Sequence, residues 1–299
     1  MPMVNFQENV LPLDAAGRSG APPHRSLGAI LVAEGRLNEP DTRRVLELQR
    51  TKGLRFGEAA LRLGLISESD LRQALAHQYD FPQLPPTLEN LSTELVAAHA
   101  PFHRRVEELR ALRTQLLIRW FNTEPTRRML AIVSPGAGEG RSYLAANLAL
   151  VFAQLGGRTL LIDADLRRPR QHALFNVSDR IGLSTVLSGR SDHGAAVQVS
   201  GFSGLWLLPA GAIPPNPQEL LSRPAFATLV AEARSRFDVV LFDTPPAKLC
   251  ADMQSVTAQA CGAVVLARKD HSALADVKNV IRDVSASGAQ VVGSVANNF

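Results

Sequence analysis

A glycine-rich stretch near the middle of the chain limits the fold more than any other feature. Residues 134–143 read SPGAGEGRSY, and they lie between the apolar run 130–133 and the helical pattern 143–155. Glycines let a backbone approach a ligand closely and aim several N–H groups at one anion. A short strand that opens through such a loop into a helix is typical of a phosphate-binding loop, which predicts an α/β domain.

The loop departs from the usual pattern at one position. A phosphate loop commonly carries Lys directly before its Ser or Thr, whereas this chain has Arg141 before Ser142. Arginine stays charged and pairs two phosphate oxygens through its planar fork, but it is not a compact point charge as lysine is. The pattern predicts phosphate binding and leaves open whether the transferring group is placed well enough for catalysis.

Apolar runs alternate with helical patterns from residue 102 onward. Continuous apolar runs are typical of strands that are covered on both faces, and the alternation predicts a doubly wound, mostly parallel α/β sheet. The predicted strands span 129–134, 159–163, 204–208, 238–243, 262–267 and 290–296.

Three aspartates stand where predicted strands end: Asp163 and Asp165 follow one apolar run, and Asp243 ends another. Because ligands bind at the carboxyl ends of parallel strands, we expect all three beside the phosphate loop. Phosphoryl transfer needs Mg²⁺, a carboxylate for the metal or its waters, and a group that orients the nucleophile. We therefore predict Ser142, Asp163 and Asp243 for the metal, and Asp163 and Asp165 to orient or deprotonate an acceptor. The alternative is that each aspartate only caps the turn or helix that follows it.

A tandem repeat occupies the N-terminal part of the chain. Residues 56–78 repeat the pattern of 27–49, and each copy predicts a short helix, a glycine turn, an N-cap (Asn38 or Ser67) and a second amphipathic helix. Neither copy alone can bury its apolar face, so the two predict one shared core. The predicted organisation is a disordered tail (1–23), a small all-α module (24–82), a proline-bearing linker (83–101) and an α/β domain (102–299).

Composition narrows the class of protein. The 299 residues are 45% hydrophobic and 20% charged, which is enough apolar material for a buried core. The net charge of +4 is mild and the basic residues are scattered, so a nucleic-acid surface is not indicated. Two cysteines in apolar surroundings, no secretory pattern and no apolar run of membrane-spanning length indicate a reducing, cytoplasmic setting.

Four stretches, taken in order, resemble the motifs of a known family. SPGAGEGRS, LLIDADLRRPR, LLPAGAIPPNPQELLSRP and VVLFDTPP are similar to the successive motifs of bacterial (BY-type) protein tyrosine kinases that work with polysaccharide chain-length-determinant proteins. The resemblance covers about residues 102–299, and the broader relatives are P-loop ATPases of the MinD and ParA type. With the repeat included, the chain most resembles the EpsG-type kinases of exopolysaccharide loci.

The resemblance implies ATP and Mg²⁺ as cofactors and assigns roles to matching positions. Asp163, Asp165 and Arg141 would act in catalysis. Asn297, near the end of the last predicted strand, would reach the adenine edge, with an ordinary turn residue as the alternative. The ATP-binding positions would be Ser134, Gly136, Gly138, Glu139, Gly140, Arg141, Ser142, Tyr143 and Asn297.

The resemblance also implies partners. Glu107, Arg110 and Arg113 fit the E-x-x-R-x-x-R pattern by which those kinases assemble into rings, and the alternative is a solvated helix face. The family works at the inner membrane through the cytoplasmic segment of a membrane chain-length (polysaccharide co-polymerase) protein. Its members typically end in a tyrosine cluster, whereas this chain ends GSVANNF and has two tyrosines, Tyr79 and Tyr143. We therefore expect no autophosphorylation of a C-terminal tyrosine cluster, and kinase activity would need another acceptor.

The repeat resembles the N-terminal domain of secretion and pilus ATPases of the MshE kind, which implies cyclic di-GMP as a regulator. Arginine can read a guanine edge or a phosphate, and glutamine can read a base edge. The first copy departs from the motif at Ser26 and Thr42, and a protein-docking module is the alternative. The matching positions are Arg25, Leu27, Gly28, Leu46, Gln49, Arg55, Phe56, Gly57, Leu71, Leu75 and Gln78.

Three functions compete for this set of motifs. The first is an ATP-dependent protein tyrosine kinase that regulates chain length in exopolysaccharide biosynthesis and export, with cyclic di-GMP as a candidate regulator. The second is a nucleotide-switched assembly ATPase of the MinD or ParA type that phosphorylates no protein. The third is a second-messenger receptor whose α/β domain is a scaffold. We predict the first, with the third included as regulation.

Overall fold

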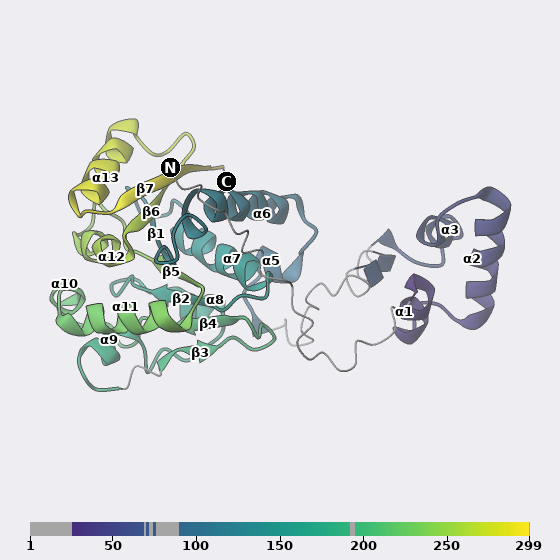
Figure 1. Ribbon diagram of the computed structural model, residues 1–299, viewed down its shortest axis with the longest axis horizontal. Helices are drawn as coiled ribbons and strands as arrows, with labels where there is room; N and C mark the ends of the chain where they lie inside the picture. The colour runs from purple at the N-terminus through teal and green to yellow at the C-terminus, as the bar shows by residue number, and fades with distance from the viewer. Residues whose placement is uncertain (1–25, 69, 72–73, 76–89, 192–194, 299) are drawn as a thin grey trace, which may run out of the picture. The chain divides into compact units, whose positions relative to one another are not determined.

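The chain folds into two compact units. The computed structural model describes residues 26–68, 70–71, 74–75, 90–191 and 195–298 (Figure 1). The units divide as Met1–Gln83 and Leu84–Phe299. The predicted disordered tail over 1–23 lies outside the described residues.

The smaller unit is helical, as the repeat predicts. Its helices are α1 (Leu27–Ala33), α2 (Glu39–Lys52) and α3 (Phe56–Arg62). The Asn38 side chain accepts a hydrogen bond from the N–H of Asp41 at 2.8 Å, and the Ser67 hydroxyl accepts one from the N–H of Asp70 at 3.1 Å. Each copy of the repeat therefore has the predicted N-cap. The shared core is made of Ile30, Leu31, Leu37, Val45, Ala59, Ala60, Ile66 and Ala74.

The larger unit is built on a seven-stranded sheet (Figure 1). Its strands are β1 (Met129–Val133), β2 (Thr159–Asp163), β3 (Val197–Gln198), β4 (Leu205–Leu208), β5 (Val239–Asp243), β6 (Gly262–Arg268) and β7 (Gln290–Asn297). They follow the order β3-β4-β2-β5-β1-β6-β7, and every pair is parallel except β3 with β4. The predicted parallel sheet is confirmed.

Helices cover both faces of this sheet (Figure 1). They are α5 (Val96–His99), α6 (Arg104–Leu116), the π-helix η2 (Leu117–Phe121), α7 (Arg141–Ala153), α8 (Gln171–Leu174), α9 (Leu183–Leu187), α10 (Pro217–Leu221), α11 (Pro224–Arg236), α12 (Asp252–Ala260) and α13 (Leu274–Ala286). Side chains alternate along β1, so Leu130 and Ile132 pack with α6 and α7, whereas Met129, Ala131 and Val133 pack with α9 to α13. The predicted doubly wound fold is therefore confirmed. No helix in the described ranges has the length and apolar character needed to cross a membrane.

The six predicted strands are present with ends that differ by at most one residue. Strand β3 is missing from the prediction. It has only two residues, Val197 and Gln198, both are exposed, and it runs antiparallel at the edge of the sheet. A strand so short carries no readable period, which explains the difference.

The prediction of a linker over 83–101 is wrong for the residues of this segment that the structure describes, which start at residue 90. There the segment packs against α7 and contains the short helix α5. Leu95 and Ala97 are fully buried. Asn147 on α7 accepts from the N–H of Ala97 and donates to the carbonyl of Glu94, both at 3.0 Å. Although prolines interrupt the helical pattern, the apolar side chains find a partner in α7, so this segment belongs to the α/β unit.

Candidate active site

The carboxyl ends of three adjacent strands meet at one place. Asp163 at the end of β2 stands beside Asp243 at the end of β5 in the sheet register, and β1 runs next to β5. The loop 134–140 leaves β1 and enters α7 at Arg141. The glycine-rich loop and the strand-end carboxylates therefore lie at the same edge of the sheet.

The loop turns sharply at two glycines. Gly138 and Gly140 have φ values of 71° and 96°, in the left-handed region that glycine enters without steric cost. Inside the loop the Glu139 carboxylate accepts from the N–H of Gly136 at 2.7 Å and from the hydroxyl of Ser272. Glu139 is a predicted ATP-binding residue, and its buried side chain braces the loop from within.

Arg141, in the usual lysine position, is buried against the loop. Its Nε donates to the carbonyl of Thr244 at 2.8 Å, and its Nη1 donates to the carbonyl of Gly136 at 2.6 Å and to the hydroxyl of Ser134. Burial lowers the pKa of Arg141, while the nearby Asp243 carboxylate acts in the opposite direction. The guanidinium therefore ties the end of β1, the loop and the end of β5 together.

Asp163 is fully buried and held by three backbone donors. Its Oδ1 accepts from the N–H of Asp165 at 3.2 Å, and its Oδ2 accepts from the N–H groups of Arg170 at 3.0 Å and Gln171 at 2.9 Å. Burial and the neighbouring Asp243 carboxylate raise the pKa of Asp163 well above its ordinary value, against the effect of these donors. Such a carboxylate holds a proton more readily than a surface aspartate, which suits a group that receives one.

Asp165 caps the turn that follows β2. Its Oδ1 accepts from the N–H groups of Arg167 at 3.2 Å and Arg168 at 2.9 Å. The Arg167 side chain in turn makes two hydrogen bonds, at 2.8 and 3.1 Å, to the buried carboxylate of Asp252 at the start of α12. The capping contact that the sequence offers as an alternative is therefore present for Asp165, and the turn is fixed to α12.

Asp243 accepts hydrogen bonds from two side chains, one on α8 and one at the start of α7. The Gln171 Nε2 donates to its Oδ2 at 2.8 Å, and the Ser142 hydroxyl donates to the same carboxylate. Asp243 is fully buried, and among the described residues its Oδ1 has no hydrogen-bond partner. Burial raises the pKa of Asp243, and the bonds from Gln171 and Ser142 oppose that shift.

This cluster fits a Mg²⁺ ion. Asp163 and Asp243 repel each other, and Oδ1 of Asp243 has no donor among the residues that the structure describes, so a hydrated dication relieves both costs. Mg²⁺ usually keeps several waters and takes one or two carboxylates together with phosphate oxygens. In the described part of the chain, no three His, Cys, Asp or Glu side chains are grouped to hold a metal without such help. Ser142, Asp163 and Asp243, the predicted metal residues, all belong to the cluster.

A cavity of about 550 Å³ opens beside the loop. Four predicted ATP-binding residues line it, namely Gly138, Gly140, Tyr143 and Asn297. The Asn297 side chain donates to the carbonyl of Glu139 at 3.1 Å, so the end of β7 is fixed to the loop. The lining also contains apolar and charged side chains, among them Leu109, Leu112, Leu266, Val295, Glu94, Arg105 and Arg170. A mostly apolar hollow with a few polar groups is the usual environment of a bound base and sugar.

The three residues of the predicted ring pattern lie on α6. Glu107 is exposed and forms an ion pair with Arg110 in the same helix. Arg113 instead reaches α7, where its Nη1 donates to the carbonyl of Val151 at 2.6 Å, and burial lowers its pKa. The chain thus uses Arg113 for helix packing and keeps Glu107 on the surface, while assembly into a ring stays a prediction.

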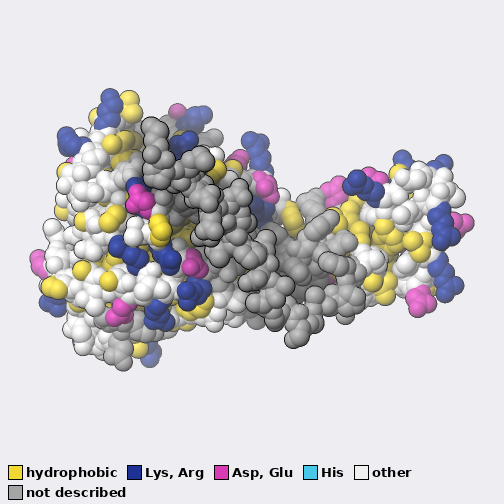
Figure 2. Space-filling view, in the orientation of Figure 1, with side chains coloured by type: hydrophobic (Ala, Val, Ile, Leu, Met, Phe, Trp, Pro, Cys, Tyr) yellow, Lys and Arg dark blue, Asp and Glu magenta, His cyan; other side chains and the backbone are white. Residues whose placement is uncertain are grey.

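The motif glycines of the helical unit lie in helix contacts. A Cβ at Gly28 would stand 3.0 Å from the ring of Phe56, and one at Gly57 would stand 2.6 Å from Leu71. Hydrophobic side chains reach the surface of this unit (Figure 2), and Leu46 is 41% exposed. The glycines therefore serve close packing, and cyclic di-GMP binding stays a prediction. Two of its predicted residues, Arg25 and Gln78, lie outside the described residues.

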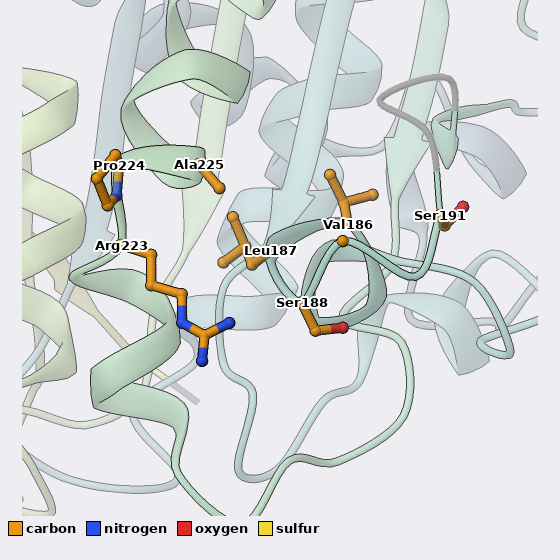
Figure 3. Close-up of a pocket in the computed structure, with 8 residues that line it drawn as sticks. Val186, Leu187, Ser188, Ser191, Arg223, Pro224 and Ala225 are labelled. Atoms are coloured by element: carbon orange, nitrogen blue, oxygen red, sulfur yellow. The ribbon is translucent and has the colours of Figure 1, made fainter.

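A second hollow, of about 690 Å³, lies between the end of α9 and the start of α11 (Figure 3). Leu187, Ser188, Arg223 and Pro224 line it. None of the residues that line it is a predicted site residue, so this hollow is separate from the phosphate loop and its carboxylates.

Sequence reasoning misses two polar residues of the site. Gln171 contacts Asp163, Asp243 and Ser142, but a single glutamine carries no motif. Thr244 accepts from Arg141 and donates its hydroxyl to the carbonyl of Ile132 at 2.7 Å. The signals for Thr244 were its position directly after a strand-end aspartate and its place in the motif VVLFDTPP.

A strand, a glycine loop and a helix beside strand-end carboxylates in a doubly wound sheet define a P-loop nucleotide-binding domain. The sequence pattern of the ParA family, described as "NUBPL iron-transfer P-loop NTPase", matches residues 125–298. That match places the whole sheet and the site residues from Ser134 to Asn297 in one family domain.

Comparison with individual proteins shows which group of P-loop NTPases this chain is similar to. The tyrosine-protein kinase YwqD of Bacillus subtilis is 35% identical over 207 residues, which are 69% of this chain and 86% of YwqD. The tyrosine-protein kinase Wzc of Salmonella typhimurium is 34% identical over 207 residues, which are 69% of this chain but 28% of Wzc. The solved kinase domain of the Escherichia coli tyrosine kinase ETK matches with a TM-score of 0.65 and 31% identity, over 68% of this chain and 79% of that one. The chain therefore belongs to the bacterial tyrosine-protein kinases, within the ParA-like P-loop NTPases.

Proposed function

We propose that this chain is an ATP- and Mg²⁺-dependent protein-tyrosine kinase whose acceptor tyrosine lies in another chain. The observation that carries the proposal is the buried pair Asp163 and Asp243 beside the glycine-rich loop, in a chain of this family. Two buried carboxylates that repel each other are stable together only with a cation or a proton nearby. Transfer of a phosphoryl group to a hydroxyl brings both to the site: the cation is the Mg²⁺ bound with ATP, and the proton is the one that the hydroxyl loses.

Each part of the site has a step to perform. The N–H groups at the start of α7, after Gly138 and Gly140, receive the phosphates at the positive end of the helix. Ser142 and Asp243 hold the metal, which when bound neutralises charge on the transferring group. Asp163, fixed by its backbone donors and by the turn at Asp165, orients the acceptor hydroxyl and takes its proton.

Arg141 supports the loop rather than reaching out from it. Its three bonds hold Ser134, Gly136 and Thr244 in one arrangement. A site whose dipoles are already in place stabilises developing charge without reorganisation. Arg141 thus contributes its charge at short range and keeps the backbone donors aimed at the phosphates.

The nucleoside occupies the cavity beside the loop in this proposal. Tyr143 and Leu144 of α7 lie on one side, and Leu266 and Val295 of the sheet lie on another. Asn297 lines the same cavity, at reach of a base edge, although one of its donors already holds the loop.

The partner and the biological role follow from the family resemblance. We propose that the chain binds the cytoplasmic segment of a membrane polysaccharide co-polymerase, acts at the inner membrane through it, and controls chain length in exopolysaccharide export as an EpsG-type kinase. Glu107 and Arg110 on α6 form part of the subunit contact of a homo-oligomeric ring. The nucleotide-switched assembly ATPase is the weaker alternative, since relatives at 34% and 35% identity are named as kinases.

We propose in addition that the helical unit is an MshE-type regulatory module that takes cyclic di-GMP. The supporting observations are the short first helices α1 and α3, the N-caps Asn38 and Ser67, and the exposed side chains of Leu46 and Arg55. Titration of the full chain with cyclic di-GMP tests this directly. Binding that is lost in Arg55→Ala supports the module, whereas no binding at micromolar ligand makes it a protein-docking unit.

The test of the kinase proposal uses the full chain with Mg-ATP and the cytoplasmic segments of its membrane partner. Mass spectrometry maps phosphotyrosine for the wild type, Asp163→Asn and Arg141→Ala. Asp179→Asn, a change at a half-exposed aspartate of the same domain, is the matched control. Phosphotyrosine in the wild type and control that is lost in Asp163→Asn is the expected result. Release of ADP without phosphotyrosine in any of them would identify the assembly ATPase instead.

A further inference from the structure

Gln171, the first residue of α8, links three parts of the site. Its backbone N–H donates to Oδ2 of Asp163 at 2.9 Å. Its side-chain Nε2 donates to Oδ2 of Asp243 at 2.8 Å and to the carbonyl of Ser142 at 3.1 Å. The residue is fully buried, so none of these bonds competes with bulk water. One side chain therefore holds the β5 carboxylate against the start of the phosphate-loop helix.

The orientation of the Gln171 amide follows from its partners. A carboxylate and a carbonyl both accept, so the NH₂ group of the amide must face them and its oxygen must point elsewhere. That oxygen, Oε1, is buried and has no hydrogen-bond partner among the described residues, and the same holds for Oδ1 of Asp243. Gln171 and Asp243, which are hydrogen-bonded to each other, therefore each have one buried acceptor atom that needs a donor, and both atoms belong to the cluster that fits Mg²⁺.

Water molecules bound to Mg²⁺ are the donors that match this pair. Mg²⁺ usually retains several of its waters and takes few protein ligands, and each bound water has two hydrogens to donate. Side chains that hold a metal ligand from behind are part of the metal site, because they fix the orientation of the ligand.

We infer that Gln171 is a positioning residue for the nucleotide-bound Mg²⁺: it holds Asp243 in place and, together with Asp243, accepts hydrogen bonds from the waters of the metal. The inference rests on the proposed binding of Mg-nucleotide, and it is independent of whether a tyrosine is the acceptor.

Binding of ADP at varied Mg²⁺ tests this role without any turnover. Calorimetric titration of the full chain gives the affinity for ADP in EDTA and the Mg²⁺ concentration that half-saturates the gain in affinity. Gln171→Leu removes both the donor and the acceptor at similar volume, and Gln171→Met serves as a second variant should the first not fold. Gln154→Leu is the matched control, because Gln154 also donates to a main-chain carbonyl, that of Ala97, at the other end of α7.

The expected result is a rise of about 10–100-fold in the half-saturating Mg²⁺ concentration for Gln171→Leu, with ADP affinity in EDTA within about twofold of the wild type. Gln154→Leu should match the wild type in both measurements. In an Asp243→Asn background, Gln171→Leu should change the Mg²⁺ dependence less than it does in the wild type, since part of its effect passes through Asp243.

Three outcomes would overturn the inference. Unchanged Mg²⁺ dependence in folded Gln171→Leu and Gln171→Met would remove the positioning role alone. An equal loss of ADP affinity with and without Mg²⁺ would make Gln171 a support of the loop and not of the metal. A wild-type chain that binds no ADP at all would overturn the proposed function as well.

Discussion

The two sides of the phosphate site differ in how far the chain satisfies its own polar groups. On the loop side, Glu139 and Arg141 bond to the loop backbone and to the ends of neighbouring strands. On the carboxylate side, Asp163 and Asp243 repel each other, and Oδ1 of Asp243 has no partner in the described part of the chain. On the loop side the chain itself supplies the bonds that fix the backbone, whereas the carboxylate side gains free energy when a cation or a proton binds.

The two sides should therefore contribute differently to nucleotide binding and to phosphoryl transfer. A loop that is already formed gives affinity for phosphate at little cost in ordering. A carboxylate cluster under repulsion gives dependence on the metal and on the acceptor. Changes on the two sides should therefore differ in whether they alter stability or chemistry.

The largest effect is expected from Asp163→Asn. The amide cannot take the proton of an acceptor hydroxyl, so the rate of phosphoryl transfer should fall by about 10²–10⁴-fold. The affinity for ADP should change little because the loop is untouched. Time courses of phosphotyrosine formation and a titration with ADP check the two halves of this prediction. If Asp163→Asn transferred phosphate at the wild-type rate, a group other than Asp163 would have to take the proton of the acceptor hydroxyl.

The next effect is on stability and comes from the loop side. Arg141→Ala removes three buried hydrogen bonds and leaves the carbonyl of Thr244 without its side-chain donor, while the Gly136 carbonyl keeps the Ser134 hydroxyl, so the free energy of unfolding should fall by about 3 kcal/mol. For a unit of this size the melting temperature should fall by roughly 6–12 °C. Thermal unfolding without nucleotide is the measurement, and Arg141→Lys, which keeps the charge, should lose less. Equal melting of wild type and Arg141→Ala would show that the three bonds contribute nothing.

The carboxylate side, unlike the loop side, should make the free energy of unfolding depend on pH. Asp163 and Asp243 have pKa values above their ordinary value in the folded chain, so the folded state binds protons that the unfolded state releases. Their contribution to the free energy of unfolding is full below the ordinary pKa of about 3.9, and it is lost as the pH rises through the raised values.

Urea unfolding at several pH values, without and with Mg-ADP, measures this loss. In the absence of metal the wild type should become less stable as the pH rises from mildly acidic to neutral, and Asp243→Asn should show a smaller fall because one carboxylate is gone. Mg-ADP should reduce the fall in the wild type. A pH-independent stability in EDTA would contradict the repulsion on which the comparison rests.

The smallest effect on the single chain is expected on α6. Glu107→Ala removes an ion pair in which Glu107 is exposed but Arg110 is only 16% exposed, so the free energy of unfolding should change by less than about 1 kcal/mol. The same variant should show a clear loss of oligomers, since the proposed ring uses the α6 surface that carries Glu107. Sedimentation at several concentrations is the measurement, with Glu124→Ala, which breaks a pair of the same spacing to Arg127, as control. Identical sedimentation of all three proteins would remove Glu107 from the subunit contact.

Much of the fold is readable from the sequence because buried parallel strands appear as apolar runs. The six strands and the place of Asp163 and Asp243 at their ends follow from that pattern. The contacts of Gln171 do not, because they depend on how α8 folds back over the strand ends. The direction of the Arg141 side chain is equally unreadable, since its acceptors include Thr244 at the end of another strand.

Asn147 joins the first described residues of the α/β unit to the helix of the phosphate loop, through Ala97 and Glu94. Gln154, farther along α7, donates to the carbonyl of Ala97 at 3.2 Å. A fragment that began at residue 102 would lose the bonds of both amides to this segment, leave Asn147 only its bond to the carbonyl of Tyr143, and uncover the surface that Leu95 buries. The smallest fragment to survive a protease should therefore retain this entry segment.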